Sequence, residues 1–189
     1  MPQRLSRDEA ARLLAQPNRR YPTGLRNKAM LRILYRCGLR CDELLSLRLR
    51  DVQIARHEIR VNEGKGAKDR IVWMDAATAE LVDAWKARRA ELARTWPAKT
   101  DSLFTTLDGG RIDNSYMRHM LNRYGKKAGI EIRCHPHLLR HTFASEFLED
   151  GGTLIELQAQ LGHDRLETTA IYSHVSNERL RRWMIDRPG

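Results

Sequence analysis

Four short stretches of the chain carry side chains that could act together on a phosphate ester. Gly38-Leu39-Arg40 follows an apolar helix pattern, and Gly64-Lys65-Gly66 lies between two strand-like runs. Further on come His137-Leu138-Leu139-Arg140-His141 and Leu161-Gly162-His163, with Tyr172 nine residues beyond the last histidine. Each stretch alone is a weak signal, because a His-x-x-Arg pair on one helix face usually has a structural role. Together they supply arginines, histidines, a lysine and a tyrosine.

The cationic side chains of this set suit metal-free attack on a phosphodiester. Arg40 and Arg140 can hold the non-bridging oxygens bidentately and neutralise the charge that builds in a pentacoordinate transition state. Lys65 can donate a proton to the leaving oxygen, because an ammonium group on a turn reaches into a site easily. No divalent ion is then needed for this chemistry.

Tyr172 is the candidate nucleophile. A phenol attacks poorly until a neighbouring base accepts its proton and cations lower its pKa, and His137 or His163 could be that base. The residue types alone leave other tyrosines open as nucleophiles: Tyr21, Tyr35, Tyr116 and Tyr124.

Periodicity predicts the elements that must hold these groups. Ser6-Arg7-Asp8-Glu9 is a capping box that opens a helix, and Gly38 is a natural stop for the helix before Arg40. Two strand-like runs, 58–62 and 70–74, flank the turn with Lys65 and indicate a hairpin. Apolar spacing predicts helices over residues 6–15, 25–37, 76–94, 114–128, 137–150, 153–161, 167–172 and 177–185, with a short helix near residue 44. We therefore expect a single domain that is mainly α with a small antiparallel β-sheet, an α+β fold.

The composition points to a polyanionic partner. The 189 residues include 34 Lys and Arg against 24 Asp and Glu, a formal net charge of +10. A charge of this size favours nucleic acid. In the helix predicted over residues 25–37, Lys28, Arg32 and Arg36 recur on one side, so we expect an exposed basic stripe there. A solvated face without a partner is the alternative.

Several protein classes are disfavoured. No apolar run approaches the length of about 18 residues that spans a bilayer, and the N-terminus lacks a signal peptide's apolar stretch, so we expect a cytoplasmic protein. Cys37, Cys41 and Cys134 form no CxxC pair, which disfavours a disulfide framework or a common zinc module. His137 and His141 lie one turn apart, but no further ligand stands at a usual spacing, so we expect no metal site.

The order Arg, Lys, His-x-x-Arg, His, Tyr resembles that of the tyrosine recombinases, the lambda-integrase family, and is most similar to its Xer-like bacterial members. The resemblance spans nearly the whole chain and rests on Arg40, Lys65, His137, Arg140, His163 and Tyr172. It favours Tyr172 as the nucleophile, because only this tyrosine follows His163 at the family spacing. It also implies that Glu43 supports Arg40, and that Lys68 is a second hairpin lysine able to replace Lys65.

The resemblance implies a site-specific recombinase. Tyr172 would attack double-stranded DNA and leave a 3′-phosphotyrosyl link and a free 5′-hydroxyl, which then attacks the partner duplex, with neither ATP nor metal. The outcome would be integration, excision, inversion or dimer resolution, carried out by a homotetramer on two DNA sites that is expected to be a monomer when free. We expect DNA contacts from Lys28, Arg32, Arg36 and Lys68.

The resemblance also bears on domain organisation. Residues 1–189 would form a single catalytic domain, with the family's N-terminal core-binding domain absent. The last predicted helix carries Leu180, Trp183 and Met184 on one face and is too short to be stable alone. The family's arrangement implies that this face docks on the neighbouring protomer in the DNA-bound assembly.

Two other functions stay open. One is a DNA-binding protein of the same fold that has lost strand exchange, which would form no covalent link to DNA. The other is a type IB topoisomerase, which uses similar phosphotyrosine chemistry to relax supercoiled DNA without a specific site. Cleavage and relaxation assays distinguish the three.

Overall fold

The chain folds mainly into helices, with one small antiparallel sheet, as predicted. The structure is a computed structural model that describes residues 3–62, 69–162 and 173–186. Its elements, in chain order, are α1 (Arg7–Ala15), α2 (Pro22–Cys37), α3 (Cys41–Ser46), η1 (Leu49–Asp51), β1 (Val52–Gln53), η2 (Ile54–Arg56), β2 (Glu58–Val61), β3 (Arg70–Trp73), α4 (Ala76–Thr95), α5 (Asn114–Lys127), α6 (Pro136–Glu149), α7 (Leu154–Leu161) and α8 (Ser173–Asp186). None of the helices in this described part is long and apolar enough to cross a membrane.

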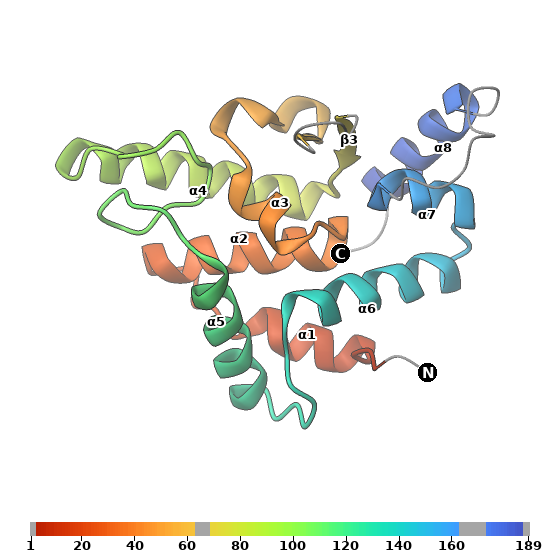
Figure 1. Cartoon of the computed structure of the whole chain (residues 1–189), viewed down its shortest axis with the longest axis horizontal. Helices are drawn as coiled ribbons and strands as arrows, with labels where there is room; N and C mark the ends of the chain where they lie inside the picture. The colour runs from red at the N-terminus through yellow and green to blue at the C-terminus, as the bar shows by residue number, and fades with distance from the viewer. Residues whose placement is uncertain (1–2, 63–68, 163–172, 187–189) are drawn as a thin grey trace.

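The central helix is α2, which packs against α4 on one side and α6 on another (Figure 1). It begins at Pro22, three residues earlier than predicted, because proline at the first position of a helix has a preset φ and lacks only an N–H that would be unpaired there. It ends at Cys37 with Gly38 as its C-cap, as predicted. Gly38 has a φ of +69°, and a Cβ there would lie 2.5 Å from Cδ1 of Phe143. Both the backbone conformation and the close approach of α6 therefore require glycine.

The strands pair in the order β1-β2-β3, with both pairs antiparallel. Ile59 of β2 faces Val72 of β3, and both side chains are fully buried. The predicted strands 58–62 and 70–74 are confirmed to within a residue at each end. The turn between them, which carries Lys65 and Lys68, lies outside the described residues.

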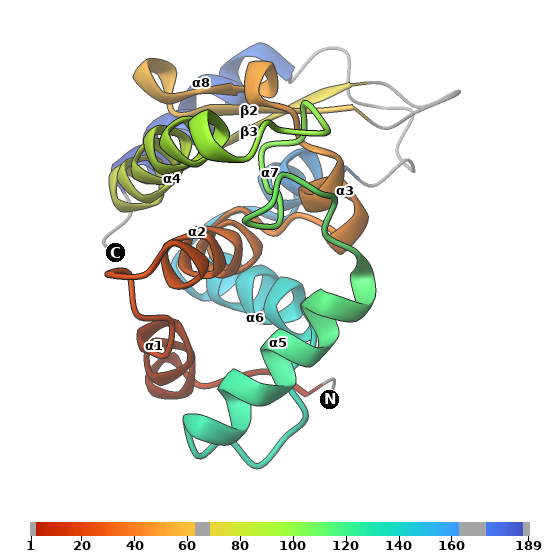
Figure 2. The same ribbon diagram turned by 90° about the vertical axis from the view of Figure 1, so that its left-hand side faces the viewer.

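Two buried clusters hold the molecule together. The larger one joins α1, α2, the sheet, α4, α5 and the first turn of α6, which contributes Leu138 and Leu139. The smaller one gathers Trp73, Phe143, Phe147, Leu157, Leu161, Leu180 and Met184. Figure 2 shows the sheet and α8 at one end of the molecule and α1 and α5 at the other, with α2 and α6 between them. The middle helix α6 thus belongs to both clusters.

The basic stripe predicted on α2 is not an exposed face. Arg36 is 5% exposed, and its Nε donates to Asp75 Oδ2 at 2.7 Å. Arg32 Nη2 lies 3.2 Å from the same oxygen. Lys28 is half-buried, and burial, together with the charges of Arg19 and Arg32, lowers its pKa. The expectation of an exposed stripe is therefore wrong, because α4 packs on this side of α2 and brings a buried carboxylate to Arg32 and Arg36. Contact of these side chains with DNA stays a prediction.

The last helix, α8, docks on its own chain. Leu180 and Met184 are each 1% exposed within the smaller cluster, and the Trp183 ring centroid lies 4.5 Å from that of Phe147. The apolar face of α8 was predicted correctly, and in the single chain it docks on the smaller cluster. Helix α8 covers a surface that is formed by the aromatic residues of α6 and the apolar face of α7. Docking of this face on a neighbouring protomer in the DNA-bound assembly stays a prediction.

Candidate active site

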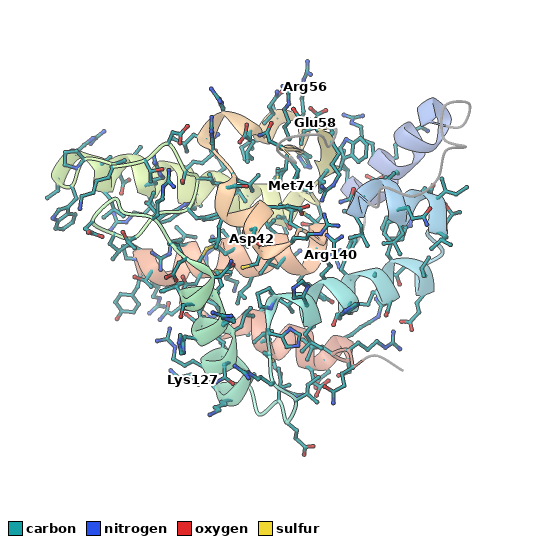
Figure 3. All side chains as sticks on the ribbon, viewed as in Figure 1. Asp42, Arg56, Glu58, Met74, Lys127 and Arg140 are labelled. Carbon is teal, nitrogen blue, oxygen red and sulfur yellow. The ribbon has the colours of Figure 1, made fainter. Side chains whose placement is uncertain are left out.

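Arg140 ties the ends of two helices together. Its side chain, on α6, donates from Nη1 to the carbonyl oxygen of Gly38 at 2.6 Å and from Nη2 to that of Leu161 at 3.0 Å. Gly38 follows the last residue of α2, and Leu161 is the last residue of α7, so both acceptors are helix-end carbonyls, which need donors. Figure 3 shows Arg140 where α6 passes the end of α2. Arg140 is 8% exposed, so its charge is fixed in position.

Arg40 is the N-cap of the short helix α3 and is held there by Glu43. Glu43 Oε2 accepts from the Arg40 backbone N–H at 2.7 Å, and Oε1 accepts from Arg40 Nη1 at 2.8 Å. The side chain of Arg40 remains 41% exposed, whereas that of Glu43 is only 10% exposed. The structure therefore shows the contact expected between Glu43 and Arg40, with the guanidinium group accessible to a ligand.

Glu43 joins the two candidate phosphate-binding arginines. Its Oε2 lies 3.9 Å from Arg140 Nη1. Burial alone would raise the pKa of Glu43, but hydrogen bonds from Arg70 and from the Arg40 backbone, together with the Arg70 charge, bring it below its ordinary value. The carboxylate is therefore ionised near neutral pH and keeps the guanidinium groups together.

Sequence reasoning missed Arg70, a further side chain that binds Glu43. Its Nη1 and Nη2 donate to the two carboxylate oxygens at 3.0 and 2.9 Å. In the sequence Arg70 is one residue of a strand-like run, and its only signal is its place just after the glycine-rich turn. A buried carboxylate needs a buried cationic partner to offset its loss of hydration, and an exposed arginine alone does not supply one. The expected burial of Glu43 could therefore have pointed to Arg70.

His137 is exposed one turn before Arg140 on α6, so both side chains share a helix face. They lie in the first turns of the helix, where the dipole and backbone N–H groups favour an anion. The N-cap is His135, whose Nδ1 accepts from the Leu138 backbone N–H at 3.2 Å. Burial lowers the pKa of His135, as do the nearby charges of His137, Arg133 and His141. The cap thus requires a neutral His135.

The remaining predicted residues, Lys65, Lys68, His163 and Tyr172, lie outside the described part of the chain. Their assignments stay predictions. Among the predicted residues that the structure describes, Arg40, Glu43 and Arg140 are brought together by side-chain contacts, with His137 one turn before Arg140 on α6. Within the described ranges, no group of three His, Cys, Asp or Glu side chains is placed to hold a metal ion.

Three of the alternative tyrosines are already engaged. Tyr35 is 7% exposed and donates to Glu146 Oε2 at 2.8 Å. Tyr124 is equally buried and accepts from Asn27, while Tyr116 bonds both Asn27 and Arg26. These contacts disfavour them as nucleophiles. Tyr21 is exposed on the loop before α2.

Comparison with known proteins identifies relatives along the whole length of the chain. A model of the phage integrase family matches residues 3–179. The tyrosine recombinase XerC of Pelotomaculum thermopropionicum is 37% identical over 185 residues, which cover 96% of this chain and 60% of that protein. The tyrosine recombinase XerD of Ralstonia nicotianae is 35% identical over 181 residues, covering 96% and 58%. The chain thus spans about 60% of the length of these relatives.

Solved structures share the fold. The crystal structure of XerA recombinase superposes with a TM-score of 0.77 at 36% identity, covering 100% of this chain and 66% of that one. XerH site-specific recombinase, bound to its difH substrate in a pre-cleavage complex, gives a TM-score of 0.75 at 27% identity, covering 96% and 53%. With the clustered arginines and the adjacent histidine in place, these likenesses show that the chain belongs to the phage integrase family and has a tyrosine recombinase catalytic-domain fold.

Proposed function

We propose that this chain is the catalytic domain of a site-specific tyrosine recombinase, acting on double-stranded DNA in the cytoplasm. The observation that carries the proposal is the convergence of Arg40 and Arg140 on the carboxylate of Glu43. Arginines held in this way suit a phosphate whose charge grows during reaction, because their donors are already oriented and need no reorganisation. XerH, solved with its difH substrate, supports DNA as the partner class.

The described side chains have separable tasks in this proposal. Arg40, with its accessible guanidinium, contacts a non-bridging oxygen of the scissile phosphate. Arg140 adds positive charge from a fixed, mostly buried position. His137, on the same face of α6, hydrogen-bonds the phosphate or accepts a proton at the start of the reaction.

The chemical step rests on the resemblance for its remaining groups. The Tyr172 oxygen forms a bond to phosphorus as the bond to the 5′ oxygen breaks, and His137 or His163 accepts the phenolic proton. Lys65, or Lys68 in its place, protonates the departing 5′ oxygen. The reverse of this step, with the 5′-hydroxyl of a partner duplex, rejoins the strands. A homotetramer on two DNA sites is the assembly we propose, with residues 1–189 as one catalytic domain in each protomer.

A covalent trap tests the proposal. A duplex site is first selected by binding from a pool with randomised sequence, then synthesised with a nick at each position of its centre. We expect a denaturation-resistant protein–DNA adduct in EDTA and without nucleotide, mapped to Tyr172. Tyr172→Phe should bind the duplex as the parent does and form no adduct, while Tyr116→Phe serves as the matched control and keeps the adduct.

The other outcomes identify the alternatives. No adduct from any protein at low salt and high protein concentration indicates a DNA-binding protein without strand exchange. An adduct accompanied by relaxation of plasmids that lack the selected site indicates topoisomerase-like activity. An adduct that persists in Tyr172→Phe overturns the nucleophile assignment.

A further inference from the structure

Arg70, the first residue of β3, is clamped between two segments of the candidate site. It donates to both carboxylate oxygens of Glu43, at 3.0 and 2.9 Å, and from Nε to the carbonyl oxygen of Gln160 at 3.2 Å. Its side chain is 10% exposed. One guanidinium group therefore joins β3 to α3, which begins beside Arg40, and to the last turn of α7.

A single carboxylate, that of Glu43, faces three guanidinium groups. Arg40 binds one of its oxygens at 2.8 Å, Arg70 binds both, and Arg140 approaches to 3.9 Å. The planar fork of Arg70 fixes the plane of the carboxylate, because two parallel N–H donors match its two oxygens. The direction in which Glu43 presents its oxygens to Arg40 is thus set by Arg70.

Loss of Arg70 would change the partners of the other two arginines. Glu43 would remain buried and charged but would lose the two hydrogen bonds that Arg70 donates. Among the other cations of the described residues, Arg140 would then be able to attract the carboxylate, from 3.9 Å. A shift of the carboxylate toward Arg140 would weaken the 2.6 Å bond from Arg140 to Gly38 and the hold on Arg40. Arg70 thus offsets part of the negative charge of Glu43 and holds the carboxylate in its position between Arg40 and Arg140.

We propose that Arg70 is a positioning residue for DNA cleavage, which acts through Glu43 to keep Arg40 and Arg140 oriented for the scissile phosphate. This inference rests on the proposed function. The place of Arg70 in the chain supports it, because Arg70 follows the turn with Lys65, and Gln160 precedes Leu161-Gly162-His163. The same side chain therefore connects the segments that lead to the other candidate catalytic groups.

The first test compares Arg70→Met with Arg60→Met. Arg60 lies on the neighbouring strand β2 and pairs with Asp69 at the surface, where its side chain is 61% exposed, so it is a matched arginine without a link to Glu43. The measurement is the single-turnover rate of adduct formation on the nicked duplex, with affinity for the intact duplex and the melting temperature of each variant. We expect Arg70→Met to slow cleavage about 10- to 100-fold with affinity nearly unchanged, and Arg60→Met to cleave like the parent.

A double-mutant cycle separates positioning from mere folding support. If Arg70 acts through Glu43 on both Arg40 and Arg140, Arg70→Met should slow the Arg40→Ala variant by a smaller factor than it slows the parent, because only the effect through Arg140 remains. Losses that multiply in the double variant would overturn the proposal. Arg70→Lys keeps the positive charge but cannot donate two parallel hydrogen bonds to Glu43. If Arg70→Met folds poorly, Arg70→Lys replaces it in the cycle, and we expect Arg70→Lys to slow cleavage as well.

A neutral substrate gives a readout that a structural role would not move. A methylphosphonate at the scissile position removes the charge that Arg40 and Arg140 neutralise, so the gap between the parent and Arg70→Met should shrink. An unchanged gap would overturn the proposal. Absence of an adduct from the parent itself would overturn the proposed function and this inference together, whereas equal rates for the parent and Arg70→Met would overturn the positioning role alone.

Discussion

The guanidinium group of Arg140 donates a 2.6 Å hydrogen bond to the carbonyl oxygen of Gly38, the C-cap of the central helix α2. The bond links the start of α6 to the segment that leads into Arg40. A side chain with a proposed role in catalysis therefore also holds two helices in register.

Because of this double role, Arg140 and Arg40 should respond differently to replacement by lysine. We expect either substitution to slow adduct formation about a hundredfold, or about 3 kcal/mol, because an ammonium group cannot make the fork. Arg140→Lys should also lower the free energy of unfolding by about 2 kcal/mol, since it removes charged hydrogen bonds to buried carbonyls. Arg40→Lys, at a more exposed site, should leave stability nearly unchanged.

Single-turnover rates and urea unfolding check this difference. DNA affinity should change little in either variant, because binding depends on many phosphate contacts. Equal losses of binding and cleavage in Arg140→Lys would instead make Arg140 a general DNA anchor.

The histidine cap of α6 should make stability depend on pH. Burial, and then the charge of His137, lowers the pKa of His135 below its ordinary value of 6.5. The folded state therefore favours the neutral ring, and the stability that this contributes is complete above pH 6.5 and is lost as the pH falls through the lowered pKa. Asparagine caps equally well and does not titrate in this range.

Urea unfolding at pH 7.5 and pH 5, on the parent and His135→Asn, measures the effect. The parent should lose more stability than the variant between these two pH values. An identical loss in both proteins would show that other groups control the acid response.

The buried carboxylate of Asp75 should be among the most sensitive positions outside the site. Asp75→Asn leaves Arg36 and Arg32 without their anion, which for a buried pair costs about 3–5 kcal/mol of unfolding free energy. Asp83→Asn, on the exposed face of the same helix, should change it by less than about 0.5 kcal/mol. Chemical denaturation of both variants tests this, and similar small effects would mean that water replaces the ion pairs.

Trp183 should stabilise the isolated monomer. Its ring packs on Phe147, so Trp183→Ala should lower the free energy of unfolding by about 2 kcal/mol at a protein concentration where sedimentation shows a monomer. Trp96→Ala, at a tryptophan that is 51% exposed, is the control and should have a small effect. An unchanged unfolding free energy for Trp183→Ala would favour docking of α8 on another protomer.

Much of the fold could be predicted because its signals are local. The Ser6 capping box is present, with Ser6 Oγ accepting from Glu9 N–H and the Glu9 side chain accepting from Ser6 N–H. Gly38 ends α2 with a positive φ, as its residue type indicates. The strands around the turn follow from the alternation of apolar and polar residues over 58–62 and from the apolar run over 71–74. In each case a few adjacent residues determine the result.

What could not be predicted depends on partners far away in the sequence. The spacing of Arg32 and Arg36 shows that they share a helix face, but only the packing of α4 reveals that Asp75 covers it. The link from Glu43 to Arg40 could be predicted from the family pattern, whereas the link to Arg70 depends on where β3 lies against α3. The apolar face of α8 could be predicted from the sequence, but the surface against which it packs could not.

The division of α6 between two buried clusters has an energetic consequence. Its first turn, with Leu138 and Leu139, is anchored in the larger cluster, while Phe143 and Phe147 belong to the smaller one with α7 and α8. Local opening that releases α8 would uncover the second half of the helix first and leave the turn with His137 and Arg140 supported. Amide hydrogen exchange should then divide α6 into a slowly exchanging half and a faster one, two cooperative units within one continuous helix.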